Sequence, residues 1–340
     1  MSILDYIKKL TSNQNLSAEE SESIFKTIMN GDATPAQIAA ILVSLKMKGE
    51  SNQEIAGAAK VLRDKSEKLQ APENAMDTCG TGGDGLGTYN ISTAVAFVLA
   101  GGGIPIVKHG NKGVSSRSGS SDVLRELGVN IDASKETMEK ALQDAQICFM
   151  MAPKYHNAMR HVAQVRQELG IRTIFNILGP LANPAGAKYQ LLGVYSKDLV
   201  SKMANVLSQL GSKRAWVVHG EDGLDEITTT GITHVAELKD GEVSNFTINP
   251  EDYGIKLVSS QDLKGGDARE NAYELKEILL NRGKKPYLDI VLLNSAAAFV
   301  IHGKAKDLHE GLILAKQSIN SLKANVALDS LVRISNNIYS

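Results

Sequence analysis

The chain has 340 residues, of which 43% are hydrophobic and 22% charged, and its 37 Lys+Arg and 38 Asp+Glu leave a formal net charge of -1. This is the composition of a globular protein with one large domain or two smaller ones, and it excludes a largely disordered chain. Balanced charge without a basic block, together with 5% aromatic residues, argues against nucleic acid as a partner.

The two cysteines, Cys79 and Cys148, lie far apart without C-x-x-C spacing. They predict neither a disulfide framework nor a zinc site, and they fit a reducing cytoplasm. Residues 1–15 carry charges within a short apolar pattern, which predicts a helix rather than a signal peptide. Glycines and a proline interrupt the longest uncharged stretch, residues 89–107, so we expect no membrane span.

The first 70 residues have a helical pattern throughout. Ser17 and Ser51 each stand three residues before a glutamate, the spacing of a capping box, and Thr34 precedes a proline as an N-cap does. These signals predict three helix starts. The helix after Thr34 has an apolar stripe at helical period, made by Ile38, Ile41, Leu42, Leu45 and Met47.

From residue 71 onward, short apolar runs alternate with helical segments. This alternation predicts an α/β fold with a parallel or mixed sheet. Segment 241–267 is less periodic, and helices follow it to the C-terminus. The predicted strands are 104–107, 147–151, 190–195 and 215–218, and the predicted helices between them include 118–127, 135–145 and 197–210.

A glycine-rich segment, residues 77–88, precedes an apolar helix that begins near Ser92 and Thr93. Glycine backbone amides, hydroxyls and a helix N-terminus together predict a phosphate site, with a flexible turn as the alternative. The segment formally contains G-x-G-x-x-G, but residues 72–76 form a polar approach instead of a buried strand, which argues against a dinucleotide site. A phosphate-binding P-loop motif is absent.

A basic, serine-rich segment, residues 108–122, directly follows the predicted strand 104–107. It places Lys108, Lys112 and Arg117 among glycines and serines ahead of a helix. Such a loop is often only solvated, but beside a glycine loop at a neighbouring strand end it predicts a polyanion site.

An acidic segment follows the strand 215–218. Asp225 and Glu226 are adjacent, and Glu221 and Asp222 precede them. Oxygen ligands of this kind could hold magnesium beside a phosphate; the alternative is a solvated acidic loop. The spacing is not that of an EF-hand.

Three arginines, Arg160, Arg166 and Arg172, lie on or just after a predicted helix next to a segment rich in glycine and proline. A guanidinium matches a carboxylate well, although surface arginines that cover the helix are the simpler alternative. Spacing does not choose among the three.

Taken together, these motifs closely resemble the anthranilate phosphoribosyltransferase family over nearly the whole chain. KHGN and the glycine loop are also found in the related pyrimidine nucleoside phosphorylases. The resemblance is carried by GTGGD at 80–84, NIST at 90–93, KHGN at 108–111, SSRSGS at 115–120, VRQELGIRTIFNILGPLANP at 165–184 and DGLDE at 222–226, with ATPAQIAAILVSLKMKGE at 33–50.

The resemblance implies a helical domain, residues 1–70, completed by helices near 160–182, and an α/β domain, residues 71–340, with a central, mostly parallel sheet flanked by helices. It implies a cytoplasmic homodimer that catalyses the second step of tryptophan biosynthesis from chorismate. Anthranilate and 5-phosphoribosyl 1-pyrophosphate (PRPP) would give N-(5-phosphoribosyl)anthranilate and pyrophosphate, with Mg2+.

The resemblance also implies residue roles. Anthranilate would meet Gly80, Asn111 and Arg166, which selects Arg166 by analogy alone. Magnesium would be held by Ser92, Asp225 and Glu226, and Lys108 would join the two acids in catalysis. PRPP would contact Gly80, Gly83, Asp84, Thr88, Asn90, Ile91, Ser92, Thr93, Lys108, His109, Gly110, Asn111, Lys112, Gly113, Val114, Ser115, Ser116 and Ser120.

Some features depart from the family pattern or leave a choice open. Asn157 and Gln164 stand where proline is usual, and Gly113 where alanine or serine is usual. His109 is a candidate proton acceptor by position, and an orienting role is the alternative that we favour. The alternative functions are a pyrimidine nucleoside phosphorylase and a non-catalytic phosphate-sugar binding protein on the same fold.

Overall fold

A computed structural model describes residues 2–113 and 118–338. The chain begins with four helices, α1 (Ile3–Thr11), α2 (Ala18–Asn30), α3 (Pro35–Lys48) and α4 (Asn52–Lys65). Ser17, Thr34 and Ser51 are the N-caps of α2, α3 and α4, and each forms a complete capping box, which confirms the three predicted starts.

The apolar stripe of α3 is one residue shorter than predicted. Ile38, Ile41, Leu42 and Leu45 are buried, but Met47 is 83% exposed. Two residues after Leu45 correspond to a rotation of about 200° around a helix, so Met47 points away from the stripe. Its inclusion in the stripe was wrong.

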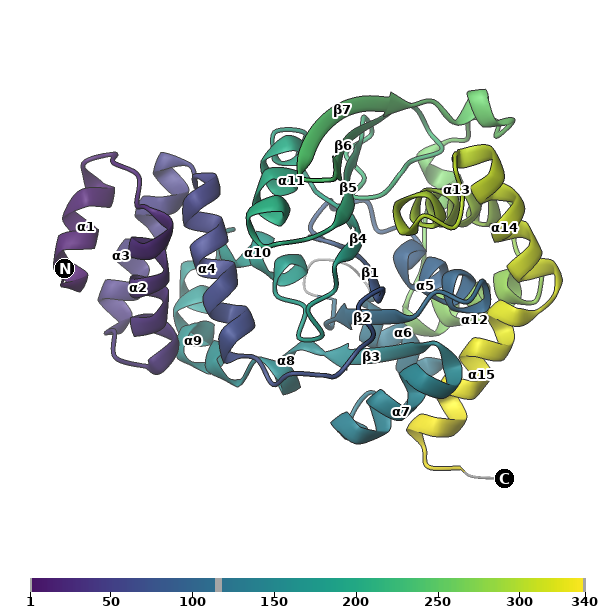
Figure 1. The fold of residues 1–340 in the computed structure, drawn as a ribbon, viewed down its shortest axis with the longest axis horizontal. Helices are drawn as coiled ribbons and strands as arrows, with labels where there is room; N and C mark the ends of the chain where they lie inside the picture. Colours follow the sequence, from purple (N-terminus) through teal and green to yellow (C-terminus); the bar gives the residue numbers. More distant parts are fainter. Residues whose placement is uncertain (1, 114–117, 339–340) are drawn as a thin grey trace.

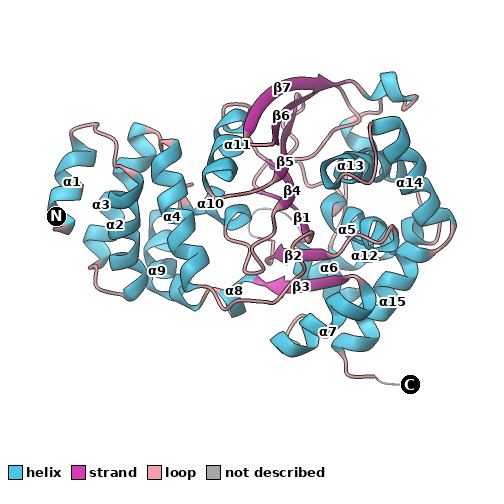
Figure 2. Ribbon diagram, viewed as in Figure 1, coloured by secondary structure: helices cyan, strands magenta, loops and turns pink. Residues whose placement is uncertain are grey.

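Seven strands form a sheet in the order β3-β2-β1-β4-β5-β6-β7, seen edge-on at the centre of Figure 2. The first five pair in parallel and the last two are antiparallel, which confirms a mostly parallel sheet. The strands are β1 (Met76–Gly80), β2 (Ile106–Gly110), β3 (Ile147–Met151), β4 (Tyr189–Gly193), β5 (Arg214–Gly220), β6 (Thr233–Lys239) and β7 (Glu242–Ile248).

Helices cover both faces of the sheet (Figure 1). On one face lie α5 (Ile91–Gly101), α6 (Ser120–Glu126), α7 (Lys135–Ala145), α12 (Ala268–Leu279), α13 (Lys285–His302), α14 (Leu308–Asn320) and α15 (Lys323–Ser335). The other face packs on α11 (Leu199–Gln209), and beyond it lie α1–α4 with α9 (Arg160–Leu169) and α10 (Phe175–Leu178). Short helices α8 (Ala152–Tyr155), η1 (Asn157–Met159), η2 (Gly179–Leu181), η3 (Pro250–Tyr253) and η4 (Ser260–Leu263) complete the chain.

Alternate residues of the central strands face two separate apolar cores. On β4, Leu191 packs into the core with α5 and α13, and Leu192 into the core shared with α4 and α11. The period of two is that of a strand buried on both faces. Among the described helices, none is both long and apolar enough to cross a membrane.

Three strands are missing from the sequence prediction. The antiparallel pair β6 and β7 falls around and inside the segment judged irregular, and β7 is largely exposed. The strand β1 leads directly into the glycine loop, where the sequence analysis predicted a polar segment, residues 72–76, and no buried strand. That judgement was wrong because β1 is buried although it carries Asp77 and Thr78.

Candidate functional site

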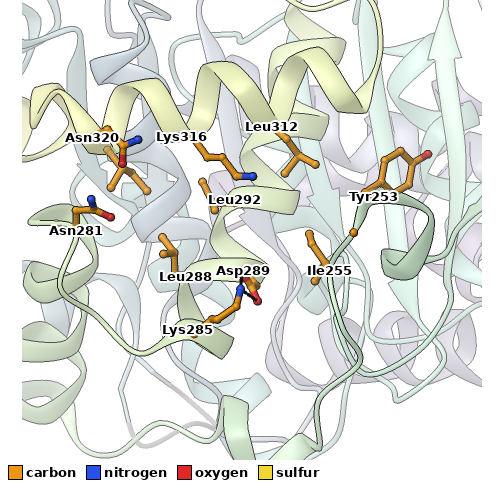
Figure 3. A pocket seen from close by; sticks show the side chains of 12 residues that line it. Tyr253, Ile255, Asn281, Lys285, Leu288, Asp289, Leu292, Leu312, Lys316 and Asn320 are labelled. Atoms are coloured by element: carbon orange, nitrogen blue, oxygen red, sulfur yellow. Dashed lines mark hydrogen bonds and ion pairs between the residues drawn. The ribbon is translucent and has the colours of Figure 1, made fainter.

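The structure contains a large cleft of about 910 Å³ between the carboxyl ends of the parallel strands and the segment that includes α9 and α10. A smaller hollow of about 270 Å³ lies elsewhere, among η3, α13, α14 and Asn281 in the turn after α12 (Figure 3). Lys285 and Asp289 form an ion pair on the wall of this hollow, and the Lys316 side chain extends toward the hollow from α14. None of the predicted site residues lines this hollow, so the cleft is the candidate site.

Fourteen of the predicted PRPP contacts line the cleft. They are Gly80, Gly83, Asp84, Thr88, Asn90, Ile91, Ser92, Thr93, Lys108, His109, Asn111, Lys112, Gly113 and Ser120. Gly110 does not line it: a side chain there would collide with Ser120 and Phe149, so this glycine serves close packing. Val114, Ser115 and Ser116, with Arg117, lie outside the described residues.

Two strand-end glycines make room for the acidic loop. A Cβ atom at Gly80 would lie 2.2 Å from Asp225 Oδ2, and one at Gly193 would lie 1.5 Å from the Asp225 carbonyl oxygen. The loop therefore rests directly on the ends of β1 and β4. Gly193 is a site residue that the sequence analysis missed, because a single glycine at a strand end has no motif around it.

Of the two carboxylates of this loop, Glu226 is buried and Asp225 is half-buried, and each accepts a backbone hydrogen bond. Gly82 N–H donates to Asp225 Oδ2 (2.7 Å), and Ser92 N–H donates to Glu226 Oε1 (3.1 Å). Burial raises the pKa of Asp225 to about 7 and that of Glu226 to about 8, and repulsion from Asp84 and between the two groups adds to the shift. A cation placed here would offset that repulsion.

Lys108 lies at the floor of the cleft with only 3% of its surface exposed. Its ammonium donates to the Thr78 carbonyl (2.6 Å) and to Ser92 Oγ (3.3 Å). Burial lowers the pKa of Lys108, and the neighbouring Asp77 charge opposes that shift. Asp77 in turn accepts from Asn183 Nδ2 (2.7 Å). Asp77 and Asn183 therefore support Lys108, and neither was predicted as part of the site.

The described parts of the basic segment, residues 108–113 and 118–122, meet at the start of α6. Gly113 N–H and Gly119 N–H both donate to Asp122 Oδ2, at 3.0 and 2.9 Å. Ser120 Oγ donates to the Asn111 carbonyl (3.4 Å). Asp122 thus fixes both ends of the predicted phosphate loop, a role that its place in the sequence did not indicate.

Of the three arginines, two line the cleft. The Arg166 guanidinium lies over the Phe175 ring, 5.3 Å from its centroid, and burial lowers its pKa. Arg172 lies over Tyr195, 4.4 Å from the centroid, and donates to the Gly83 carbonyl. Arg160 is not among the lining residues.

His109 packs against His156, with ring centroids 5.0 Å apart. Burial lowers the pKa of His109 to about 3 and that of His156 to about 4, so both rings are neutral at physiological pH. Each Nε2 atom is buried without a hydrogen-bond partner in the described structure. His109 lines the cleft as a neutral imidazole.

The described residues can supply some of the ligands of a magnesium ion, but not all of them. In residues 2–113 and 118–338, no group of three or more histidine, cysteine, aspartate or glutamate side chains is placed to hold a metal by itself. Two adjacent carboxylates with mutually raised pKa values, beside Ser92, suit a cation that takes its other ligands from phosphate and water.

Comparison with known proteins agrees with this geometry. Residues 4–66 match the helical bundle domain of the glycosyl transferase family, and residues 72–325 match its a/b domain. Anthranilate phosphoribosyltransferase of Paramagnetospirillum magneticum is 51% identical over 95% of this chain and 93% of its own length.

Two solved structures have the same fold. The anthranilate phosphoribosyltransferase of Thermus thermophilus superposes with a TM-score of 0.92 at 40% identity, covering 97% of this chain and 99% of that one. The Saccharomyces cerevisiae protein in complex with PRPP and Mg has a TM-score of 0.89 at 31% identity and covers 98% of both chains.

Proposed function

The chain belongs to the anthranilate phosphoribosyltransferases of the glycosyl transferase family, and from that premise we propose how its cleft carries out the reaction. The enzyme transfers the phosphoribosyl group of PRPP to the amine of anthranilate and releases pyrophosphate, a step of tryptophan biosynthesis. The observation that carries the assignment is the meeting of Asp225, Glu226, Lys108 and the glycine loop in one cleft.

The strand-end side of the cleft would bind PRPP. Breaking the bond to the anomeric carbon leaves negative charge on pyrophosphate, and fixed positive partners lower the energy of that state. The glycine-loop amides and Lys108 supply such partners. Lys108 is already held by Thr78 and Ser92, so it needs little reorganisation when charge develops.

Magnesium is the cofactor, and Asp225, Glu226 and Ser92 would hold it directly or through water. The ion would neutralise charge on the pyrophosphate as it leaves. Burial and mutual repulsion raise the pKa values of the two carboxylates, which favours their protonated forms in the absence of the ion. Binding of the ion by these side chains would therefore release protons to solvent.

The α9 side of the cleft would bind anthranilate. Arg166 is held by Phe175, and the part of the chain that the structure describes gives its guanidinium no carboxylate partner, so its donors suit the anthranilate carboxylate. Asn111 and Gly80 line the same cleft. An aromatic amine is neutral at pH 7, so orientation and proximity suffice without a general base. Neutral His109 would orient rather than titrate.

The two alternative functions are not favoured. A pyrimidine nucleoside phosphorylase transfers a sugar to phosphate and has less need of a paired acidic site. A non-catalytic binding protein would not need it either. The identity to anthranilate phosphoribosyltransferases along 95% of the chain supports the transferase.

We propose that the chain acts as a cytoplasmic homodimer with a domain boundary near residue 70. The dimer follows from the resemblance, and the exposed apolar side chains of Leu4 (55%) and Met47 (83%) on the N-terminal helices are compatible with it. Cys79 and Cys148 are buried free thiols, as a reducing compartment favours. The helices α9 and α10 pack against α2, α3 and α4 and would complete the first domain.

A fluorescence assay tests the function. Anthranilate fluorescence should fall only when the protein, PRPP and Mg2+ are all present. A parallel reaction with a pyrimidine nucleoside and phosphate should release no base. Unchanged anthranilate, or release of the base, would contradict the transferase.

A further inference from the structure

The loop that carries Asp225 and Glu226 has no helix or strand of its own between β5 and β6. Gly82 N–H and Ser92 N–H bind the carboxylate groups themselves, so the placement of the two side chains also depends on what holds the backbone beside them. The next residue, Ile227, is fully buried, and its backbone is hydrogen-bonded to one side chain of α13, that of Asn294.

Asn294 makes three hydrogen bonds with its amide. Its Oδ1 atom accepts from Ile227 N–H (2.9 Å), and its Nδ2 atom donates to the Ile227 carbonyl (2.8 Å) and to the Ile290 carbonyl (2.8 Å). Hydrogen bonds to both the N–H and the carbonyl of one residue fix the position of that residue and the orientation of the two peptide groups beside it. The third bond fixes the amide itself to α13.

Besides the bonds from Gly82 N–H to Asp225 and from Ser92 N–H to Glu226, further hydrogen bonds close the loop on itself. Asp222 Oδ2 accepts from Thr228 Oγ1 (2.7 Å) and Thr230 Oγ1 (2.6 Å), and Asp222 Oδ1 accepts from Leu224 N–H (3.1 Å). These bonds give the loop its shape. They do not attach the loop backbone to the helical layer, as Asn294 does.

We propose that Asn294 is a positioning residue for magnesium binding, which it controls by holding the backbone of Ile227, directly after Glu226. The inference rests on the proposed function, in which Asp225 and Glu226 hold the ion. A buried amide in an apolar helix costs free energy unless all its hydrogen bonds are made. Asn294 is fully buried, and two of its three bonds reach the loop.

The test compares Asn294→Ala with Ser295→Ala. Ser295 is the next residue of α13, is equally buried, and its hydroxyl has no hydrogen-bond partner within the described residues, so it is a matched control. In Asn294→Ala we expect the half-saturating Mg2+ concentration to rise about tenfold. Turnover at saturating Mg2+ and the half-saturating anthranilate concentration should stay within about threefold. Ser295→Ala should leave all three unchanged.

A second readout needs neither metal nor activity. In the metal-free protein, amide hydrogen exchange at Ile227 should be at least about tenfold faster in Asn294→Ala than in Ser295→Ala. If Asn294→Ala does not fold, Asn294→Asp replaces it, because that change keeps the size and Oδ1 but loses the Nδ2 donor.

The outcomes separate the two proposals. A lower turnover at every Mg2+ concentration with an unchanged half-saturating value, or unchanged exchange at Ile227, would overturn the role of Asn294. If Asp225→Asn leaves the Mg2+ dependence unchanged, the assignment of the metal to this loop is wrong, whatever Asn294 does.

Discussion

The two walls of the cleft are built differently. On the strand-end wall, Glu226 and Lys108 are buried and Asp225 is half-buried. Each is fixed by a hydrogen bond to the backbone of the glycine loop, of the start of α5 or of β1. On the opposite wall, Arg166 rests on the Phe175 ring from the surface of α9. Hydrogen bonds hold the side chains of one wall in place, and a contact with an aromatic ring holds the arginine of the other.

The difference follows from what each wall has to do. Charge appears on pyrophosphate during the reaction, and partners that are already oriented stabilise it without further rearrangement. The anthranilate carboxylate carries the same charge before and after transfer. Arg166 therefore needs only to bind and orient it, which a single well-placed guanidinium can do.

The largest effect should come from neutralising the two carboxylates of the strand-end wall. We expect Asp225→Asn combined with Glu226→Gln to lower kcat/KM about 10³-fold, because the Mg2+ ligands are lost. Glu221→Gln is the control, since it removes a charge from the same loop where that charge is half exposed and paired with His234. Full activity of the double variant in the fluorescence assay would disprove the metal assignment.

A steric change at the same wall should have the next largest effect. In Gly193→Ala the new Cβ atom would overlap the Asp225 carbonyl, so the loop must shift, and we expect a loss in kcat/KM of about 10²-fold. Gly231→Ala is the control, because its Cβ meets nothing within 4 Å. Equal activity of the two variants would show that the loop tolerates displacement.

On the other wall, Arg166→Ala should raise the half-saturating anthranilate concentration about 30-fold and leave that for PRPP within about twofold. Arg166→Lys should recover part of the loss, because it keeps the charge without the planar fork. Arg160→Ala lies outside the cleft and serves as the control. Equal effects on both substrates would contradict carboxylate recognition by Arg166.

The smallest effect concerns stability and pH. The folded-state pKa values of Asp225 and Glu226 are raised, so the folded metal-free protein binds more protons than the unfolded chain between about pH 4 and pH 8. Its free energy of unfolding should therefore fall, relative to the Asp225→Asn, Glu226→Gln variant, as pH rises from 5 to 8. We expect a relative loss of at least about 1.4 kcal/mol, equivalent to one pKa unit, in urea titrations. A constant difference would contradict the raised values.

The sequence predicted the features that depend on neighbouring residues and missed those that depend on contacts between distant segments. Capping residues such as Ser17 and Ser51 and the apolar strand β3 follow local rules, so the predicted helix starts and the β3 boundaries are confirmed. β1 was missed because its polar residues are buried against partners from distant segments, such as Asn183. Hydrophobic periodicity cannot show such pairing.

The site divides in the same way. The glycine, basic and acidic loops are contiguous motifs, and the structure brings described residues of all three into one cleft. Arg166 was separated from Arg160 and Arg172 only by resemblance. Gly193 and Asn294 carry no motif, because each acts through contact with the acidic loop, more than 30 residues away in the chain.

The buried charges at the centre of the sheet also bear on how the protein reaches its fold. Asp77 on β1 and Lys108 on β2 are both enclosed, and Asp77 also accepts from the His109 backbone N–H (3.4 Å). If one strand slipped by a single residue, its charged side chain would turn toward the opposite apolar layer. We therefore expect mispaired sheets to be rejected early in folding, so that the lysine of the cleft also selects the correct strand alignment.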